Sequence, residues 1–339
     1  SVSHELRTPL TAINGWAETL SADPGANIEQ TKRGLGIILK ESRRLTTMVE
    51  ELLEFTKMQA YCNDYVYVIT FDQEVKNPAA AARFVSDRHK GVGSDGMIMI
   101  CPSAIADFRM RVFNPDGSEA EMCGNALRST GKLVYVKGLT SKTDFTVETL
   151  GGIKKIHLTV ENGDVVNITA NIGRPIFDAD RIPVTVTNEN NALIGYDYTI
   201  LDRIFNITAL SLGNPHCAVL CDDIYSIDIA KYGHALECSP IFPNKANIHF
   251  YDVTNRENIR MIAWERNCGE TLACATGCCT CVTAANLAGL CDSHVNVHQK
   301  GGIIVIDYDK ASGDLVMTGK SEIVFDGEID DRLLTGGNL

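Results

Sequence analysis

The chain has 339 residues, 45% of them apolar, and a formal net charge of -12, which suits two or three globular domains with ordinary cores. The acidic charge excludes the basic surface that binds nucleic acid, and no run of about 18 to 20 apolar residues could span a membrane. The first residues lack a signal pattern, so we expect a cytoplasmic protein whose twelve cysteines stay reduced and whose partners are small molecules or proteins.

Residues 1–54 predict a helical hairpin. Apolar residues from Leu35 onward alternate three and four positions apart, as in a coiled-coil seam, and a second amphipathic stretch runs over residues 10–20. Asp23-Pro24-Gly25 is a turn signal between them. The seam consists of Leu35, Ile38, Leu45, Val49 and Leu52, with Ser42 as a polar exception. Such a hairpin buries its seam best in a four-helix bundle, which predicts a homodimer.

The segment Ser3-His4-Glu5-Leu6-Arg7-Thr8-Pro9-Leu10 resembles the phosphoacceptor box of sensor histidine kinases. The resemblance implies that His4 accepts a phosphoryl group, whereas an isolated histidine on a helix would be a solvated side chain. After residue 58 we find neither the asparagine-bearing helix nor the glycine-rich lid of the kinases' ATP-binding half. We therefore do not expect the hairpin alone to form phosphohistidine from ATP.

From Tyr61 onward, short runs rich in β-branched residues predict strands in a mixed α/β body. These runs cover residues 65–70, 96–101, 145–149 and 165–170. The segment Glu54-Phe55-Thr56-Lys57-Met58-Gln59 could end the hairpin or begin the first strand of the body. A fusion joined at this point would explain both patterns.

An internal repeat with an offset of 151 residues predicts two similar halves. It superimposes Asn63 on Asn214, Cys123 on Cys274, Gly138 on Gly289 and Leu139 on Leu290. We therefore expect two pseudo-symmetric halves of mixed sheet around a central helix, over residues 55–171 and 172–339. The last strand could return to the first half.

Each half places a cysteine, Cys123 or Cys274, at the start of a helix. Apolar residues follow each cysteine, and a glycine, Gly138 or Gly289, marks the end of each helix. A helix N-terminus carries partial positive charge and unpaired N–H groups, so we expect it to lower the pKa of a thiol toward neutrality and to bind a carboxylate. Two such thiols on opposite faces of one α-carbon could exchange its proton without metal or pyridoxal phosphate. The sequence thus predicts an amino-acid racemase that needs no cofactor.

At these residues the chain resembles the diaminopimelate epimerase family, whose members interconvert LL- and meso-2,6-diaminopimelate for lysine and cell-wall synthesis. The resemblance runs from Phe55 to the C-terminus. It is carried by Asn63-Asp64-Tyr65, Asn114-Pro115-Asp116-Gly117-Ser118-Glu119, Cys123-Gly124-Asn125, Gly213-Asn214-Pro215-His216, Asn247-Ile248, Glu265-Arg266 and Gly269-Glu270-Thr271 through Cys274.

The resemblance implies a role for each matching residue. The catalytic pair would be Cys123 and Cys274. The reacting carboxylate and amine would lie among Asn63, Gly124, Asn125, Ala275 and Thr276, and the distal end of the substrate among Asn114, Asn214, Asn247, Glu265 and Arg266. His216 and Glu265 would tune the two thiols.

Three places differ from the family's pattern. Cys62 stands where a glycine normally precedes the substrate-binding asparagine, so a side chain would be strained in a loop that needs positive φ. Ala275 replaces a glycine beside Cys274, and Asn267-Cys268 interrupts the usual Arg-Gly. Two alternatives therefore stay open: another cofactor-free racemase of the same fold, for example one acting on histidine, and an inactive body that carries a dimerisation or phosphoacceptor module.

Other patterns receive less specific interpretations. The spacing Cys274-x3-Cys278-x2-Cys281 matches iron–sulfur radical enzymes, but its position late in the chain at the start of an apolar helix disagrees. A zinc site lacks a second ligand pair. Residues 91–96 predict a tight turn, and a triad of Ser211, His216 and Asp222 lacks a nucleophile elbow. We interpret Cys101, Cys217, Cys221, Cys238 and Cys291 as small interior residues.

Overall fold

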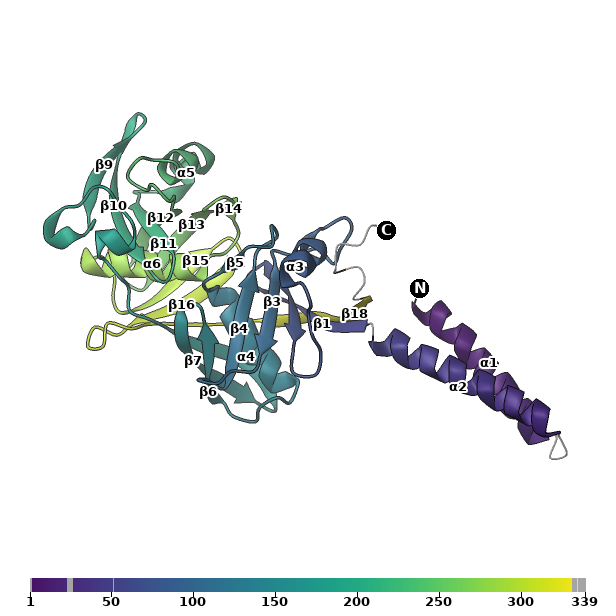
Figure 1. The fold of residues 1–339 in the computed structure, drawn as a ribbon. Coiled ribbons are helices and arrows are strands. Elements are labelled where there is room, and N and C mark those ends of the chain that lie inside the picture. The colour runs from purple at the N-terminus through teal and green to yellow at the C-terminus, as the bar shows by residue number, and fades with distance from the viewer. Residues whose placement is uncertain (1, 23–26, 51, 331–333, 335–339) are drawn as a thin grey trace. The chain divides into compact units, whose positions relative to one another are not determined.

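The computed structural model describes residues 2–22, 27–50, 52–330 and 334 (Figure 1). The chain divides into two compact units, one formed by residues 1–54 with 328–339 and the other by residues 55–327. The turn predicted at Asp23-Pro24-Gly25 lies outside the described residues. Among the described helices, none combines the length and hydropathy that crossing a membrane requires.

The first unit contains the predicted hairpin, formed by α1 (Val2–Ala22) and α2 (Ile28–Glu50). Gly34 lies against Trp16, where a Cβ would come within 2.8 Å of the indole ring, so the small residue lets the helices approach closely. The predicted seam is wrong at its end, because Leu52 begins strand β1 (Leu52–Ala60). Residues 56–60 of β1 pair with β2, so the chain is already a strand where the helical seam was predicted to end.

The first half of the larger unit is a mixed sheet. Its elements are β2 (Asn63–Ile69), α3 (Pro78–Ser86), β3 (Met97–Cys101), β4 (Phe108–Phe113), β5 (Glu119–Ala120), α4 (Gly124–Val136), β6 (Asp144–Thr149), β7 (Gly152–Glu161) and β8 (Asp164–Gly173). β2 pairs parallel with β3, β3 antiparallel with β4, and β4 parallel with β6, after which β6, β7 and β8 form antiparallel ladders. The four predicted strands are confirmed.

The second half repeats this pairing. Its elements are β9 (Tyr196–Ile200), β10 (Arg203–Ser211), β11 (Pro215–Leu220), α5 (Ile229–Glu237), β12 (Asn247–Asn255), β13 (Asn258–Glu265), β14 (Gly269–Thr271), α6 (Ala275–Leu287), β15 (His294–Gln299), β16 (Gly302–Tyr308), β17 (Leu315–Gly319) and β18 (Glu322–Asp330). β11, β12, β13, β15, β16 and β17 pair in the order and directions of β2, β3, β4, β6, β7 and β8. The predicted fold class is thereby confirmed.

The two halves are joined through their last strands. β17 forms an antiparallel ladder with β8, and β18 pairs with β1. The chain therefore returns to strands of the first half after completing the second. A boundary between the halves at residue 171 stays a prediction.

Each half surrounds one central helix, α4 or α6, whose buried residues are mostly small or apolar, with Arg128 of α4 as a charged exception. Cys278 and Cys281 of α6 are fully buried in the hydrophobic core, as is Cys217, and Cys221 and Cys291 are also buried. The interior interpretation is wrong for Cys238, which is exposed because it is the C-cap of α5 and follows the buried part of that helix. Cys101 is half-buried.

Candidate active site

The two predicted cysteines occupy equivalent positions. Cys123 is the N-cap of α4 and Cys274 the N-cap of α6, and both have an extended backbone. Each helix stops at a glycine in the left-handed region, Gly138 with φ 72° and Gly289 with φ 74°. The predicted placement of each thiol at a helix N-terminus is confirmed.

The N-termini of α4 and α6 lie against each other. A Cβ built on Gly124 would come 3.1 Å from the Cβ of Ala275. Both residues are the first of their helices, and each follows one of the two cysteines. The unpaired N–H groups of both helices therefore gather in one place, where they can receive an anionic group.

Cys123 contacts polar groups of the first half. The Tyr65 hydroxyl donates to Cys123 Sγ over 3.6 Å, and Sγ donates to Asn63 Oδ1 over 3.6 Å. Asn125 Nδ2 donates to the same Asn63 oxygen at 3.2 Å. The structure thus brings Asn63, Gly124 and Asn125 together beside this thiol.

Cys274 contacts groups of the second half. Its Sγ lies 3.6 Å from Thr276 Oγ1 and also interacts with the Glu265 carboxyl group, which Thr271 holds by a 2.5 Å hydrogen bond. The backbone N–H of Cys274 donates to Gln299 Oε1 at 3.0 Å. Glu265 and Thr276 therefore lie beside the second thiol.

Both thiols have raised rather than lowered pKa values. Burial raises the pKa of Cys123 and of Cys274, and the nearby charge of Glu265 adds to the increase. Backbone N–H groups of Ala126 and Gly277 oppose it. The predicted net lowering is wrong, because loss of water contact outweighs the helix N-termini.

Three of the predicted distal residues, Asn214, Asn247 and Arg266, form a second group. Asn247 accepts a hydrogen bond from the Arg266 backbone N–H at 3.0 Å and donates to the Pro215 carbonyl at 3.0 Å. His216 Nε2 donates to Asn214 Oδ1 at 2.7 Å. Asn247 therefore ties the loop of Asn214 to Arg266.

His216 is fully buried and its hydrogen bonds go to Asn214 and His249. Because Nε2 donates to Asn214, a neutral His216 accepts at Nδ1 from His249 Nε2 over 2.9 Å. Burial lowers the pKa of His216 well below its ordinary value and that of His249 to about 3, so both rings are neutral near pH 7. A Cβ on Gly277 would meet the His249 ring at 2.5 Å, so this pair packs against the first turn of α6.

The turn that carries Arg266 is braced from α5. Glu237 accepts from the Asn267 backbone N–H at 2.9 Å and from Trp264 Nε1 at 2.8 Å. Asn267 has φ 62°, a conformation that asparagine tolerates well, so the Asn267-Cys268 departure is accommodated by the turn.

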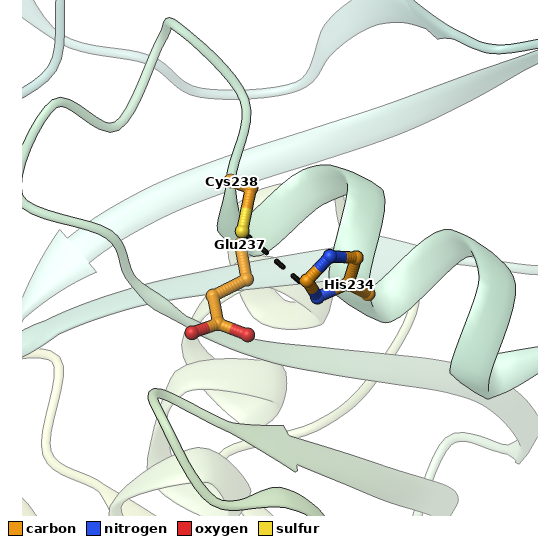
Figure 2. A group of neighbouring side chains, drawn as sticks. All are labelled: His234, Glu237 and Cys238. Carbon is orange, nitrogen blue, oxygen red and sulfur yellow. Dashed lines mark hydrogen bonds between the residues drawn. The ribbon is translucent and has the colours of Figure 1, made fainter.

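Figure 2 shows Glu237 beside His234 and Cys238 at the end of α5. One potential metal-ligand atom of each residue lies within 4.8 Å of those of the other two. The Glu237 carboxylate already accepts from three N–H donors, the third being Lys245 Nζ at 3.1 Å. A cation would have to displace these bonds and release the Arg266 turn. The group fits a structural brace better than a metal site.

Some predicted residues are placed differently or not at all. Asn114 lies in a turn where its Nδ2 donates to Ser118 Oγ at 3.0 Å, rather than to another predicted site residue. His4 lies in α1, but its side chain is outside the described part of the chain. Cys62 has φ 67° in the two-residue turn between β1 and β2, so the predicted backbone strain is confirmed.

Sequence reasoning missed Tyr65, Asp95, Arg128, His249 and Gln299. Asp95 lies in the segment interpreted as a tight turn and accepts from Asn63 Nδ2 at 2.8 Å. The repeat offered one signal, because its 151-residue offset pairs Tyr65 with the predicted site residue His216. Arg128 lies in the repeated helix, but the offset pairs it with Cys279, and Asp95, His249 and Gln299 are likewise paired with unlike residues, so only the fold brings these four to the site.

Comparison with known families agrees with both resemblances. Residues 55–177 and 208–324 match the profile of the family described as Diaminopimelate epimerase, and residues 1–61 match the His Kinase A (phospho-acceptor) domain. The matches overlap on residues 55–61, and the structure assigns residues 55–60 to β1.

Full-length relatives support the same assignment. Diaminopimelate epimerases from Methanococcus maripaludis and Acetivibrio thermocellus are 44% and 42% identical to this chain. Each alignment covers 82% of this chain and 100% or 99% of the relative.

Solved structures show the fold. A PhzF-family phenazine biosynthesis protein from Bacillus anthracis matches with a TM-score of 0.60 at 18% identity, covering 82% of this chain and 99% of that one. A hydroxyproline epimerase from Agrobacterium vitis matches with a TM-score of 0.60 at 12% identity, covering 82% and 91%.

Proposed function

The chain belongs to the diaminopimelate epimerase family and is therefore an amino-acid epimerase, and from this premise we propose that it interconverts LL- and meso-2,6-diaminopimelate. This reaction would supply lysine and peptidoglycan biosynthesis. The observation that carries the proposal is the meeting of two equivalent helix N-termini, each with a cysteine as its N-cap.

We propose that Cys123 and Cys274 exchange a proton with the α-carbon from opposite faces. The thiolate of one removes the α-proton and becomes a thiol, and the electron pair of the broken C–H bond passes into the carboxylate as an enediolate. The thiol of the other then donates its proton to the opposite face and becomes the thiolate. No cofactor enters this cycle, which inverts the carbon and exchanges the protonation states of the two cysteines.

The helix N-termini around Gly124 and Ala275 would bind the reacting carboxylate, with Asn63, Asn125 and Thr276 at its sides. Developing negative charge on that group is stabilised by N–H donors already oriented toward it. The α-ammonium group adds a positive charge beside the thiols and so offsets the burial that raises their pKa.

The distal residues favour a substrate with an amino acid at each end. Arg266 offers a planar guanidinium for a second carboxylate, and Asn114, Asn214, Asn247 and Glu265 would complete the polar site. Such a site discriminates against a shorter amino acid, which leaves its buried polar groups unpaired.

The decisive experiment follows α-proton exchange in deuterium oxide with reduced protein and LL-diaminopimelate. We expect meso product with one deuterium, lost in both Cys123→Ala and Cys274→Ala and retained in Cys238→Ala, which removes an exposed cysteine on α5. L-Histidine and L-lysine in parallel assays test other racemase activities. No exchange with either diaminopimelate isomer would contradict the substrate assignment.

For the hairpin we propose dimerisation, with His4 as a phosphoacceptor. Apolar side chains outside the α1–α2 contact support dimerisation, since Leu35 is 49% exposed and Leu39 is 58% exposed. Light scattering should give a dimer that Leu35→Glu with Leu39→Glu converts to a monomer. Phosphotransfer from a phosphorylated partner, lost in His4→Gln, would test the second role.

A further inference from the structure

A chain of side-chain hydrogen bonds passes beside Cys123. Arg128 Nη2 donates to Asn125 Oδ1 at 2.6 Å, Asn125 Nδ2 donates to Asn63 Oδ1 at 3.2 Å, and Asn63 Nδ2 donates to Asp95 Oδ2 at 2.8 Å. Four residues are thus linked in one direction, from a cation to a carboxylate. Cys123 Sγ donates to the Asn63 oxygen in the middle of the chain.

The charged ends fix the direction of this chain. A guanidinium can only donate and an ionised carboxylate can only accept, whereas an amide can turn over and present either its oxygen or its nitrogen. Arg128 therefore fixes Asn125 with its oxygen toward the cation, and Asp95 fixes Asn63 with its nitrogen toward the carboxylate. Either end alone would orient both amides through the bond between them.

The cation of this chain is fully buried on α4, which makes its presence costly. Arg128 is 0% exposed, its other acceptors are the neutral Gly124 carbonyl and Met317 Sδ, and its Nε has no partner among the described residues. A buried charge on neutral acceptors stabilises a fold poorly, and an apolar side chain often replaces it without loss. A role in orienting the site explains this arrangement better than stability does.

We propose that Arg128 and Asp95 are positioning residues that hold the Asn63 and Asn125 amides in one orientation, so that Cys123 faces a carbonyl oxygen. This rests on the proposed role of Cys123 and adds two residues to the proposed site. A carbonyl oxygen accepts the S–H proton and favours the thiol form, whereas a reversed amide would present N–H groups and favour the thiolate. The orientation of the chain therefore helps decide when Cys123 carries its proton.

The first test combines Arg128→Met with Asp95→Asn, a pair that removes one charge of each sign. Each single variant leaves one charged end to orient the amides, so we expect kcat/KM to fall less than about tenfold in each. The double variant frees both amides, and its loss should exceed the product of the single losses by at least about tenfold, the effect of one misoriented charge-assisted hydrogen bond.

The matched control pair is Arg128→Met with Asp64→Asn. Arg88 Nη2 binds Asp64 Oδ1 and Asp95 Oδ1 at 2.9 Å each, but only Asp95 accepts the Asn63 amide. The control pair also removes one charge of each sign, but Asp95 still fixes the hydrogen-bond chain. The loss of kcat/KM in this double variant should therefore equal the product of the two single losses. Circular dichroism checks folding, and Arg128→Leu replaces Arg128→Met if that variant does not fold.

The second test measures the alkylation rate of Cys123 against pH by peptide mass spectrometry, and it needs no substrate. We expect the pH at the midpoint of Cys123 alkylation to fall in the Asp95→Asn, Arg128→Met double variant. In the control pair this pH should stay near the wild-type value. Tyr65, Tyr67 and Glu265 also interact electrostatically with Cys123, and all three are unchanged in every variant. The proposal would be overturned if the losses of kcat/KM multiplied in both the test pair and the control pair and the two pairs had the same midpoint of Cys123 alkylation. That outcome would count against it even if the wild-type protein epimerises diaminopimelate.

Discussion

Gly124 and Ala275 face each other at the start of α4 and α6, with 3.1 Å between the Ala275 Cβ and the position that a Cβ on Gly124 would take. A methyl group at both positions would therefore force one of them to shift, whereas a methyl group on Ala275 alone fits. This explains how α6 accommodates the alanine at a position where the family resemblance predicts a glycine.

From this contact we expect Gly124→Ala to lower kcat/KM at least tenfold. The new methyl group would press on Ala275 and come 2.5 Å from Met317 Cε, separating the helix N-termini. Ala275→Gly should keep activity at a cost of about 1 kcal/mol of stability, and adding it to Gly124→Ala should restore part of the rate. A fully active Gly124→Ala protein would contradict this packing argument.

The Tyr65 hydroxyl should assist Cys123 as a thiolate. Tyr65→Phe removes a hydrogen bond to the charged sulfur, so we expect the pKa of Cys123 to rise and kcat to fall about tenfold. The control is Tyr67→Phe, which removes a buried hydroxyl from the ring that packs edge-on against Tyr65. The pH dependence of kcat and of Cys123 alkylation measures both effects, and equal profiles for the two variants would count against the role.

Cys62→Gly should stabilise the protein by about 1 kcal/mol, because φ 67° strains a residue with a Cβ and suits glycine. Cys268→Gly is the control, since Cys268 is also an exposed cysteine of a hairpin turn but is not among the non-glycine residues with positive φ. It should leave stability unchanged or lower it. Urea denaturation at pH 7 measures both variants, and equal changes would refute the strain argument.

Oxidation should inactivate the protein by closing a disulfide between Cys123 and Cys274, whose helices begin side by side. Reductant should restore activity. Peptide mapping in a Cys62→Ser, Cys268→Ser background excludes bonds to exposed thiols of neighbouring turns. Full activity after prolonged oxidation, or a bridge between other cysteines, would disprove this expectation.

The buried His216–His249 pair should make stability depend on pH. Because burial lowers both pKa values in the folded state, the unfolded chain binds protons that the folded chain does not. Stability is complete above the unfolded value near pH 6.5 and falls as pH drops toward about 3, by about 1.4 kcal/mol per pH unit for each imidazole. Denaturation at pH 7 and pH 5 should show a smaller difference in His249→Gln than in the exposed control His89→Gln.

Local patterns were sufficient to predict the hairpin, four of the strands and the two helices that begin at the thiols. The 151-residue repeat predicted equivalent helices, and α4 and α6 start and end 151 residues apart. The helix ends at Gly138 and Gly289 depend only on the backbone conformation of one turn, so they can be predicted from the local sequence. The same holds for the strain at Cys62, because the position of that residue beside Asn63 in a tight turn is a local property.

The tertiary structure decided how these elements act on the two thiols. Their raised pKa values depend on burial and on the charge of Glu265, which only the packed fold determines. Asp95 and Arg128 come from a loop and from the inner face of a helix, and no spacing rule places them at opposite ends of one hydrogen-bond chain. The periodicity of apolar residues indicates which face of a helix or strand is buried. The pKa of a thiol depends instead on its distances to groups far away in the sequence, and these distances are set only when the two halves pack together.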